Sequence, residues 1–337
     1  MDPWVSEIVK AHWKKIKKRP NVIGYSGKLQ SRRIDATGEV LTHHLCFRVY
    51  VKVKDKTIFP SKKECIPRKL EIKGNKVGLN SGDIRVETDV WQIGEQVALE
   101  DSRAKHRPLV GGISSNHCSG GACTGNIFWR DKKTNSIYYS SNNHGYAREN
   151  QANLGDAILQ PSPLDGGTQL DKIGELVEYV PIQYNEFTCP FRNFFHRIYR
   201  AITGEKVNKV DIAFCTIEVP YEIEVLPGKK IAGKAVPVIN EKVWKIGRTS
   251  GYTEGVVVDL DWNGTINYSR GKAFFTDCIL IHGAFSKPGD SGSPVFKTIV
   301  ELFYYYIGAL HAGSDTDTVV SKVDNIESIG KKELVIS

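Results

Sequence analysis

The sequence predicts a mainly β protein with a smaller α+β domain at its N-terminus. Most of the chain consists of short runs rich in Val, Ile, Tyr and Phe, and clusters of Gly, Pro, Asn and Asp separate these runs at short intervals. This pattern is typical of antiparallel strands, and repeated over the later part of the chain it fits an all-β barrel. A helical apolar period occurs near the N-terminus. The length of 337 residues allows about two or three domains.

Composition narrows the class of protein further. Hydrophobic residues make up 40% and charged residues 25%, as in ordinary soluble proteins, and no run approaches the roughly 18 apolar residues of a membrane span. The start of the chain lacks the layout of a secretory signal, so we expect a cytoplasmic protein with seven reduced cysteines. The net charge of +8 allows non-specific contact with acidic partners, but the basic residues are scattered and predict no specific nucleic-acid site.

Residues 1–20 are expected to form a basic amphipathic helix. Trp4, Ile8 and Ile16 recur at helical spacing over residues 4–18 with lysines between them, and Pro20 ends the pattern. Such a helix either lies on a membrane surface or partner, or packs its apolar face on the next domain, which is the commoner arrangement.

Residues 21–104 are expected to form the small α+β domain. The run from Leu45 to Lys54 alternates over its second half as a half-buried strand does, and turn residues such as Gly74-Asn75 interrupt the rest. His43-His44 with Cys46 resembles part of a metal site, but no second pair of ligands completes it, so we expect no metal.

A second domain is expected to begin near residue 105. Residues 125–130 and 136–140 form a predicted hairpin, and its second strand runs into His144. A histidine just past a strand end suits a general base, although a single histidine more often has a structural role. The Cys118-x4-Cys123 spacing beside His117 is too weak to predict zinc. Residues 183–207 are expected to form an amphipathic surface insertion.

An aspartate opens the next apolar strand, which covers residues 210–217. Asp211 would be partly buried there, which is costly unless its carboxylate accepts hydrogen bonds, and orienting a histidine would satisfy it. Five further strand-like runs follow between residues 243 and 312, separated by turns.

The most specific motif is Gly289-Asp290-Ser291-Gly292-Ser293-Pro294. A serine nucleophile needs a tight turn that presents its hydroxyl and leaves backbone N–H groups free for an oxyanion. The bare Gly-x-Ser-Gly pattern would favour an ordinary turn, whereas the full string matches the nucleophile loop of chymotrypsin-like serine proteases.

The chain resembles this family in the order of its motifs as well. His144, Asp211 and Ser291 follow one another 67 and 80 residues apart (211 − 144 and 291 − 211). The local strings are similar to those of a trypsin-like branch found in bacteria and phages and related to the plant narrow-leaf-type proteins. These strings are Ser141–His144, Gly155–Pro161 with Asp165–Gly167, Val210–Ala213, Lys245–Gly251 and Gly289–Ser293. The branch usually has an aromatic residue where this chain has His311.

The resemblance implies two antiparallel β-barrels of chymotrypsin type within a protease domain over residues 105–335. Barrel one would cover about 105–220 and barrel two about 235–330, with residues 21–104 as a leader domain. Ser291 would be the nucleophile, His144 the base and Asp211 its orienting acid, and the N–H groups of Gly289 and Ser291 would form the oxyanion hole.

The resemblance also implies where the side chain before the scissile bond would bind. One wall would contain His311, Gly313 and Ser314, and the other Phe285 and Ser286. Trypsin-type enzymes have an aspartate where Phe285 stands, so Arg or Lys is not expected. A histidine on the strand that contains His311 binds Gln or Glu in picornaviral main proteases and glutamyl endopeptidases; a residue that only fills the wall is the alternative.

We therefore expect a serine endopeptidase with a protein or peptide substrate, and with no cofactor and no metal. The competing hypothesis is a catalytically silent trypsin-like scaffold that binds a protein or acidic partner. A regulatory partner could act through the leader domain, and the sequence leaves the oligomeric state open.

Overall fold

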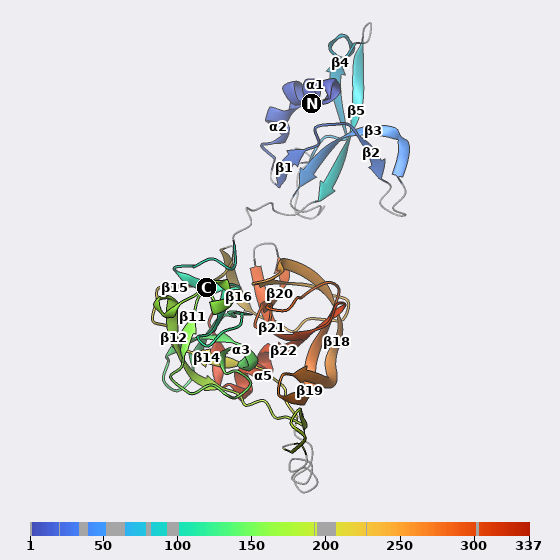
Figure 1. Ribbon diagram of the computed structural model, residues 1–337. Helices are drawn as coiled ribbons and strands as arrows, with labels where there is room; N and C mark the ends of the chain where they lie inside the picture. Colours follow the sequence, from blue (N-terminus) through green and yellow to red (C-terminus); the bar gives the residue numbers. More distant parts are fainter. Residues whose placement is uncertain are drawn as a thin grey trace. The chain divides into compact units, whose positions relative to one another are not determined.

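The structure is a computed structural model. It describes residues 2–19, 21–33, 40–51, 65–78, 82–92, 101–191, 193, 207–226, 228–300 and 303–337. The chain divides into two compact units, Met1–Ala98 and Leu99–Ser337, each with its own buried core (Figure 1).

The first unit combines a short helical segment with a small sheet. Its elements are α1 (Pro3–Ile8), a π-helical turn (Val9–Trp13), α2 (Lys14–Ile16), β1 (Val22–Tyr25), β2 (Gln30–Arg33), β3 (Val40–Val51), β4 (Lys69–Lys73), a 3-10 turn (Gly74–Lys76) and β5 (Asp83–Gln92). The sheet has the order β1-β3-β5-β4 with β2 on β3, and β3 and β5 run parallel.

The helical segment packs on this sheet through one apolar face. Val5, Ile8 and Ile16 are buried in one cluster with Phe47 and Val49 of β3. Because these residues repeat at helical spacing, the apolar stripe that the sequence displays is the face that meets the strands. The segment therefore docks on its own unit. Pro20, the expected end of the helix, lies outside the described residues.

The second unit is almost entirely β. Its elements are β6 (Leu109–Gly111), β7 (Ser114–His117), β8 (Cys123–Thr124), β9 (Phe128–Asp131), β10 (Ile137–Ser141), α3 (Asn143–Tyr146), β11 (Ala157–Leu159), 3-10 turns (Pro163–Asp165 and Gln169–Asp171), β12 (Lys172–Tyr179), β13 (Glu186–Phe187), β14 (Ala213–Cys215), β15 (Tyr221–Val225), β16 (Lys229–Lys234), β17 (Lys242–Gly247), β18 (Gly251–Tyr268), β19 (Gly271–His282), β20 (Pro294–Val300), β21 (Phe303–Gly313), β22 (Asp317–Lys322), α5 (Val323–Ile329) and β23 (Lys332–Leu334).

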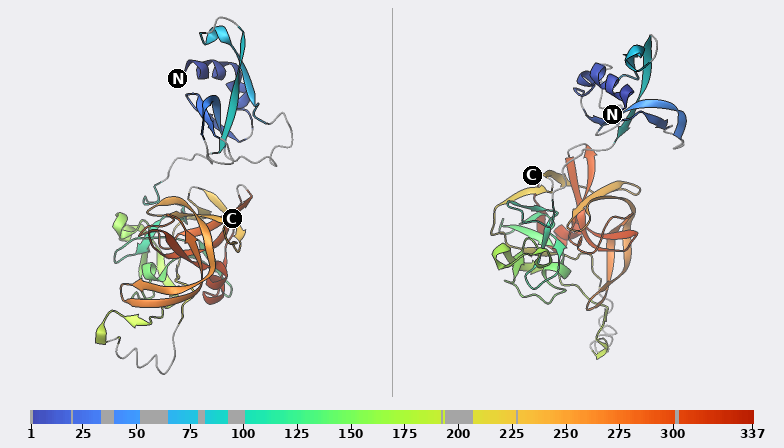
Figure 2. Two further views of the ribbon diagram at one scale, coloured as in Figure 1. Left: turned by 90° about the vertical axis from the view of Figure 1, so that its right-hand side faces the viewer. Right: turned by 45° about the horizontal axis from the view of Figure 1, so that its top comes forward.

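These strands form two sheets that follow the two expected barrels. β18, β17, β20, β21, β22 and β19 pair in a closed ring, since β22 joins both β21 and β19. An eight-stranded sheet with the order β23-β9-β10-β14-β12-β11-β7-β8 forms a half-barrel. The green strands of this sheet and the orange strands of the ring are separate groups in Figures 1 and 2. The predicted fold, mainly β with two antiparallel barrels of chymotrypsin type and a smaller N-terminal α+β part, is confirmed.

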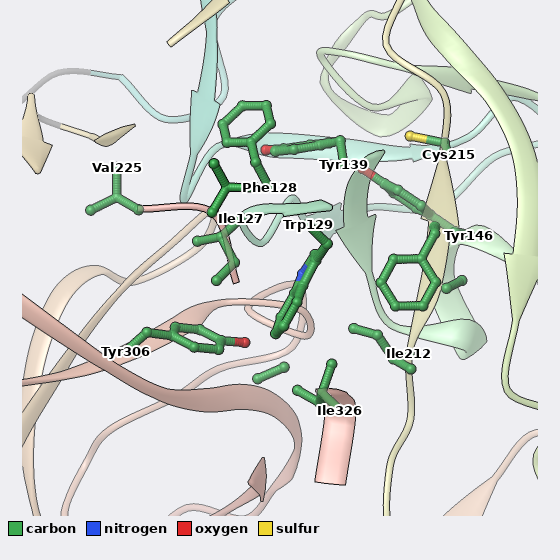
Figure 3. Close-up of a cluster of buried hydrophobic side chains, with 14 of the residues drawn as sticks. Ile127, Phe128, Trp129, Tyr139, Tyr146, Ile212, Cys215, Val225, Tyr306 and Ile326 are labelled. Carbon is green, nitrogen blue, oxygen red and sulfur yellow. The ribbon is translucent and has the colours of Figure 1, made fainter. Parts of the chain in front are cut away.

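Aromatic side chains fill the core that the two sheets share. Trp129 of β9 has its ring edge-on to Tyr306 of β21 at 5.8 Å (Figure 3). It is also edge-on to Phe214 of β14 at 6.4 Å. All three rings are fully buried. Rings in this arrangement are stabilised beyond their buried area, so they fix the two sheets against each other. Ile212, next to Asp211, lies in the same cluster.

Two predicted features fall partly outside the described residues. These are the side chains of His43 and His44, and much of the insertion over 183–207. Across the described ranges, no helix is long and apolar enough to span a membrane. Within those same ranges, no cluster of three or more His, Cys, Asp or Glu side chains could hold a metal ion.

Candidate active site

Strand pairing brings His144 and Asp211 together. β10 and β14 are antiparallel, with Ser141 opposite Ala213. His144 follows β10 on the short helix α3, and Asp211 precedes β14. In an antiparallel pair, residues just past one strand end lie beside residues just before the other, so two polar side chains distant in sequence meet at this edge. Asn142 secures the approach by donating from Nδ2 to the Asp211 carbonyl at 2.7 Å.

The two side chains form a buried pair. His144 Nδ1 lies 2.6 Å from Asp211 Oδ2, and the backbone N–H of His144 donates to Oδ1 at 3.3 Å. The Asp211 side chain is 0% exposed and that of His144 is 20% exposed. The carboxylate fixes Nδ1 as the protonated nitrogen, so Nε2 carries the lone pair that can act as a base.

Burial and pairing act in opposite directions on this histidine. Burial lowers the pKa of His144, but the Asp211 carboxylate outweighs it and holds this pKa well above its usual value. Burial raises the pKa of Asp211, yet His144 lowers it more, so the acid remains ionised. The Cys123 thiol is also near, since a Cβ added at Gly145 would lie 2.4 Å from Cys123 Sγ, and it adds to the raised pKa of His144.

The turn that contains Ser291 is built around a buried ion pair. Asp290 accepts backbone N–H groups from Thr249 at 2.8 Å, Ser250 at 3.0 Å and Lys287 at 2.9 Å. Lys245 Nζ lies 3.2 Å from Asp290 Oδ2, and both side chains are 0% exposed. Burial raises the pKa of Asp290, but Lys245 and these donors hold it below its usual value. The carboxylate therefore joins the backbone at Lys287, just before the nucleophile, to the turn between β17 and β18 at Thr249 and Ser250.

Two glycines in this turn have no substitute. Gly289 and Gly292 adopt φ values of 97° and 92°, which L-residues with side chains rarely adopt. A Cβ at Gly292 would lie 2.1 Å from the Thr124 carbonyl oxygen, so the turn also approaches β8 too closely for any side chain. The spacing of glycines in the sequence reflects both constraints.

Ser291 lies against the half-barrel through its backbone. The N–H of Thr124 donates to the Ser291 carbonyl at 2.7 Å, and Thr124 Oγ1 donates to the Gly289 carbonyl at 3.0 Å. In the described part of the chain, the N–H groups of Gly289 and Ser291 donate to no protein acceptor, and Ser291 Oγ makes no hydrogen bond. The turn thus leaves two N–H groups and a hydroxyl unengaged, as a nucleophile with an oxyanion hole requires.

A cavity of about 640 Å³ lies beside His144. Of the five residues predicted to bind substrate, His311, Gly313 and Ser314 line it. Phe285 does not, because its ring is fully buried in the core of the closed barrel. The hydroxyl of Ser286 hydrogen-bonds to Thr318 Oγ1 at 2.7 Å. It also lies against Gly313, since a Cβ built on that glycine would be 2.5 Å from Ser286 Oγ.

His311 occupies the inner wall of this cavity. Its Nδ1 lies 3.0 Å from Ser321 Oγ, and its ring packs on Phe275 at 4.9 Å. Burial lowers the pKa of His311 to about 4, so the ring is neutral at physiological pH. Nε2 is buried and has no hydrogen-bond partner among the described residues. A buried polar atom of this kind is uncommon and marks a place where a ligand atom could bind.

Comparisons with known proteins identify similar solved structures at low sequence identity. The sequence matches no protein-family model and no curated protein. Solved structures similar to this chain include Thermobifida fusca Protease A (15% identity, TM-score 0.45, 68% of this chain and 98% of that chain). Another is Cellulomonas bogoriensis chymotrypsin (15% identity, TM-score 0.43, 68% of this chain and 98% of that chain). A third is a glutamic-acid-specific serine protease described as using a histidine triad in substrate binding (16% identity, TM-score 0.44, 67% of this chain and 100% of that chain). At this level of similarity they assign no activity or substrate to the chain.

Sequence reasoning missed the residues that support the site. Tyr268 donates its hydroxyl to Asp211 Oδ2 at 3.0 Å, and no local pattern marks it. Lys245 and Arg248 both belong to the segment Lys245–Gly251, one of those on which the family resemblance rests, but the sequence alone assigns neither residue a role. Lys245 pairs with Asp290, and Arg248 pairs with Asp165 from the Asp-Gly-Gly string. A basic residue inside a strand with no acidic neighbour in sequence is the signal that could have revealed Lys245.

Proposed function

We propose that this protein is a serine endopeptidase with Ser291, His144 and Asp211 as its catalytic residues. The observations that carry the proposal are the His144–Asp211 pair at 2.6 Å and a turn, bonded to β8 of the same half-barrel, that leaves the N–H groups of Gly289 and Ser291 without a protein acceptor among the described residues. A structural histidine would need neither a buried acid on Nδ1 nor an adjacent pair of unused donors. Membership of the bacterial and phage branch is part of the same proposal, on the strings of residues quoted above.

The chemistry follows from these positions. His144 Nε2 takes the Ser291 proton as Oγ attacks the scissile carbonyl, and the imidazolium that forms is stabilised by Asp211. The oxyanion receives hydrogen bonds from the N–H groups of Gly289 and Ser291. The peptide C–N bond then breaks, the leaving amine takes the proton from His144, and the Ser291 ester is hydrolysed by a water that His144 deprotonates.

A hydrogen bond between Ser291 Oγ and His144 Nε2 is expected in the complex with substrate. In the described part of the chain, Ser291 Oγ makes no hydrogen bond. Catalytic hydrogen bonds are often long or misaligned without substrate and shorten in the Michaelis complex.

We further propose a preference for Glu or Gln before the scissile bond. With Nδ1 of His311 bonded to Ser321, Nε2 is the nitrogen left for a substrate oxygen. A neutral imidazole that donates from Nε2 suits a carboxylate or amide oxygen, and an apolar side chain would leave it unpaired. Because Nε2 is covered in this structure, the substrate side chain would have to displace what covers it.

The proposal is tested by kinetics of three variants. Ser291→Ala and His144→Ala should each lower kcat/KM for an unfolded protein substrate by about 10⁴-fold or more, because triad members act as a unit. Ser136→Ala removes a hydroxyl in an exposed turn and should cleave like the parent. Thermal unfolding confirms that each variant is folded. Turnover that survives in Ser291→Ala would refute the assignment, and a parent protein without turnover would favour the binding scaffold.

The specificity proposal has its own test. Mass-spectrometric profiling of a peptide library should show Glu or Gln before the cleaved bonds, and His311→Ala should lose that preference while still cleaving. A clear preference for Leu, Phe, Arg or Lys in the parent would overturn it.

A further inference from the structure

The acid of the proposed triad receives a hydrogen bond from the opposite barrel. His144 and Asp211 both belong to the half-barrel, whereas Tyr268 is the last residue of β18 in the closed barrel. Its hydroxyl lies 3.0 Å from Asp211 Oδ2, the same oxygen that faces His144 Nδ1. Asp211 is fully buried, so loss of this donor would remove one of the few hydrogen bonds to its carboxylate.

Tyr268 is held so that it can only donate. Its ring packs against His144 at 5.9 Å, Phe275 at 6.2 Å and Tyr184 at 6.1 Å. Burial and the nearby Asp211 carboxylate raise the pKa of the Tyr268 phenol well above its usual value, so the hydroxyl keeps its proton. A protonated phenol next to an ionised carboxylate makes a charge-assisted hydrogen bond, which is stronger than a neutral one.

The turn that presents Tyr268 is fixed from the His144 side. Glu149 lies five residues after His144 (149 − 144) and is 9% exposed. Its carboxylate accepts the N–H of Ser269 at 3.0 Å, Ser269 Oγ at 2.8 Å and the N–H of Arg270 at 3.0 Å. Arg270 Nη1 in turn donates to the Glu149 carbonyl at 2.9 Å. The turn between β18 and β19 is therefore bonded to the segment that contains the base.

We propose that Tyr268 is a positioning residue of the active site, which holds the Asp211 carboxylate from the opposite barrel and so fixes the orientation of His144. The inference rests on the proposed function and names the element that completes its triad. Without the hydroxyl, His144 would be the one side-chain donor left to Oδ2 among the described residues. The carboxylate then has freedom to rotate, and more of its negative charge is directed at the imidazole.

Tyr268→Phe keeps the ring and removes the donor. We expect kcat to fall about 10- to 100-fold, as for loss of a hydrogen bond to a charged group, with KM changed by less than about twofold. The acid limb of kcat/KM against pH should move to higher pH, because a less neutralised carboxylate raises the pKa of His144. The other titratable groups near His144 are His311, which is already neutral, the Cys123 thiol and the Glu149 carboxylate, which lines the same cavity, and the substitution removes none of them.

Tyr252→Phe is the matched control. It makes the same substitution on the same strand, where the ring is 46% exposed and the hydroxyl donates to Glu254 at 2.7 Å. It should keep the parent kcat, KM and pH profile. Should Tyr268→Phe fail to fold, 3,5-difluorotyrosine at position 268 preserves the shape and strengthens the donor, and the acid limb should then move to lower pH.

The outcomes separate this inference from the proposed function. Loss of kcat with an upward shift of the acid limb in Tyr268→Phe, and no change in Tyr252→Phe, supports it. A parent-like kcat and pH profile in Tyr268→Phe overturns it while inactive Ser291→Ala leaves the peptidase assignment intact. A rise in KM with kcat unchanged also overturns it, because Tyr268 would then act as a wall of the cavity.

Discussion

At the scale of single residues, two opposing effects set the pKa of His144, the proposed base. Burial disfavours the charged imidazolium, whereas the buried Asp211 carboxylate favours it and prevails. A protonated His144 cannot accept the Ser291 proton, so the raised pKa moves the onset of activity upward in pH.

We therefore expect the acid limb of kcat/KM to lie above the ordinary histidine value of about 6.5. Asp211→Asn removes the charge that raises this pKa, so burial then dominates and the limb should move below that of the parent, with a large loss of kcat. A pH–rate profile of both proteins measures this. An acid limb that does not move in Asp211→Asn would exclude His144 as the titrating base.

The residues proposed as catalytic can be named from the sequence because their signals are local. His144 and Asp211 each stand at the end of an apolar run, and Ser291 lies in a glycine-defined turn. The role of Tyr268 could not be predicted from the sequence, because its hydroxyl meets Asp211 only when the two sheets pack together. Phe285 was assigned to the substrate pocket from its distance to Ser291 along the chain, but its ring lies in the barrel core.

At the scale of elements, the turn between β19 and β20 depends on a strand that lies far away in sequence. Lys245 is in β17, and its ammonium is fully buried against Asp290. Two charges in such surroundings are stable only while each satisfies the other. The ion pair therefore connects strand β17 of the closed barrel to the turn that contains Ser291.

Lys245→Met removes one member of this pair and leaves a buried carboxylate without its counter-charge. We expect unfolding free energy to fall by about 3–5 kcal/mol, with loss of activity even where the protein remains folded. Lys242→Met, an exposed position on the same strand, is the control and should change stability by less than about 0.5 kcal/mol. Chemical denaturation measures both; equal stabilities would show that Asp290 does not depend on Lys245.

At the scale of the whole molecule, the residues of the proposed site all lie in the unit Leu99–Ser337. The helical segment and the small sheet form a different unit with a separate core. Sequence patterns predicted the class of each part because strand and helix periods are local. The protease domain predicted over residues 105–335 lies within the second unit, Leu99–Ser337.

We expect a chain limited to residues 99–337 to fold and to cleave short peptides with kcat/KM within about threefold of the full chain, because its core and triad are self-contained. Calorimetry and peptide kinetics of the two proteins test this. A loss of about 100-fold would show that residues 1–98 contribute to the active site.

The central claim is that His144 activates Ser291, and covalent labelling tests it most directly. Diisopropyl fluorophosphate should add one group to the folded protein, and peptide mapping by mass spectrometry should place it on Ser291. His144→Ala should abolish the adduct, whereas His282→Ala, which alters an exposed histidine bonded to Asp317 at 2.9 Å, should label like the parent. Labelling that is absent from the parent, occurs on another residue, or persists in His144→Ala would contradict the account.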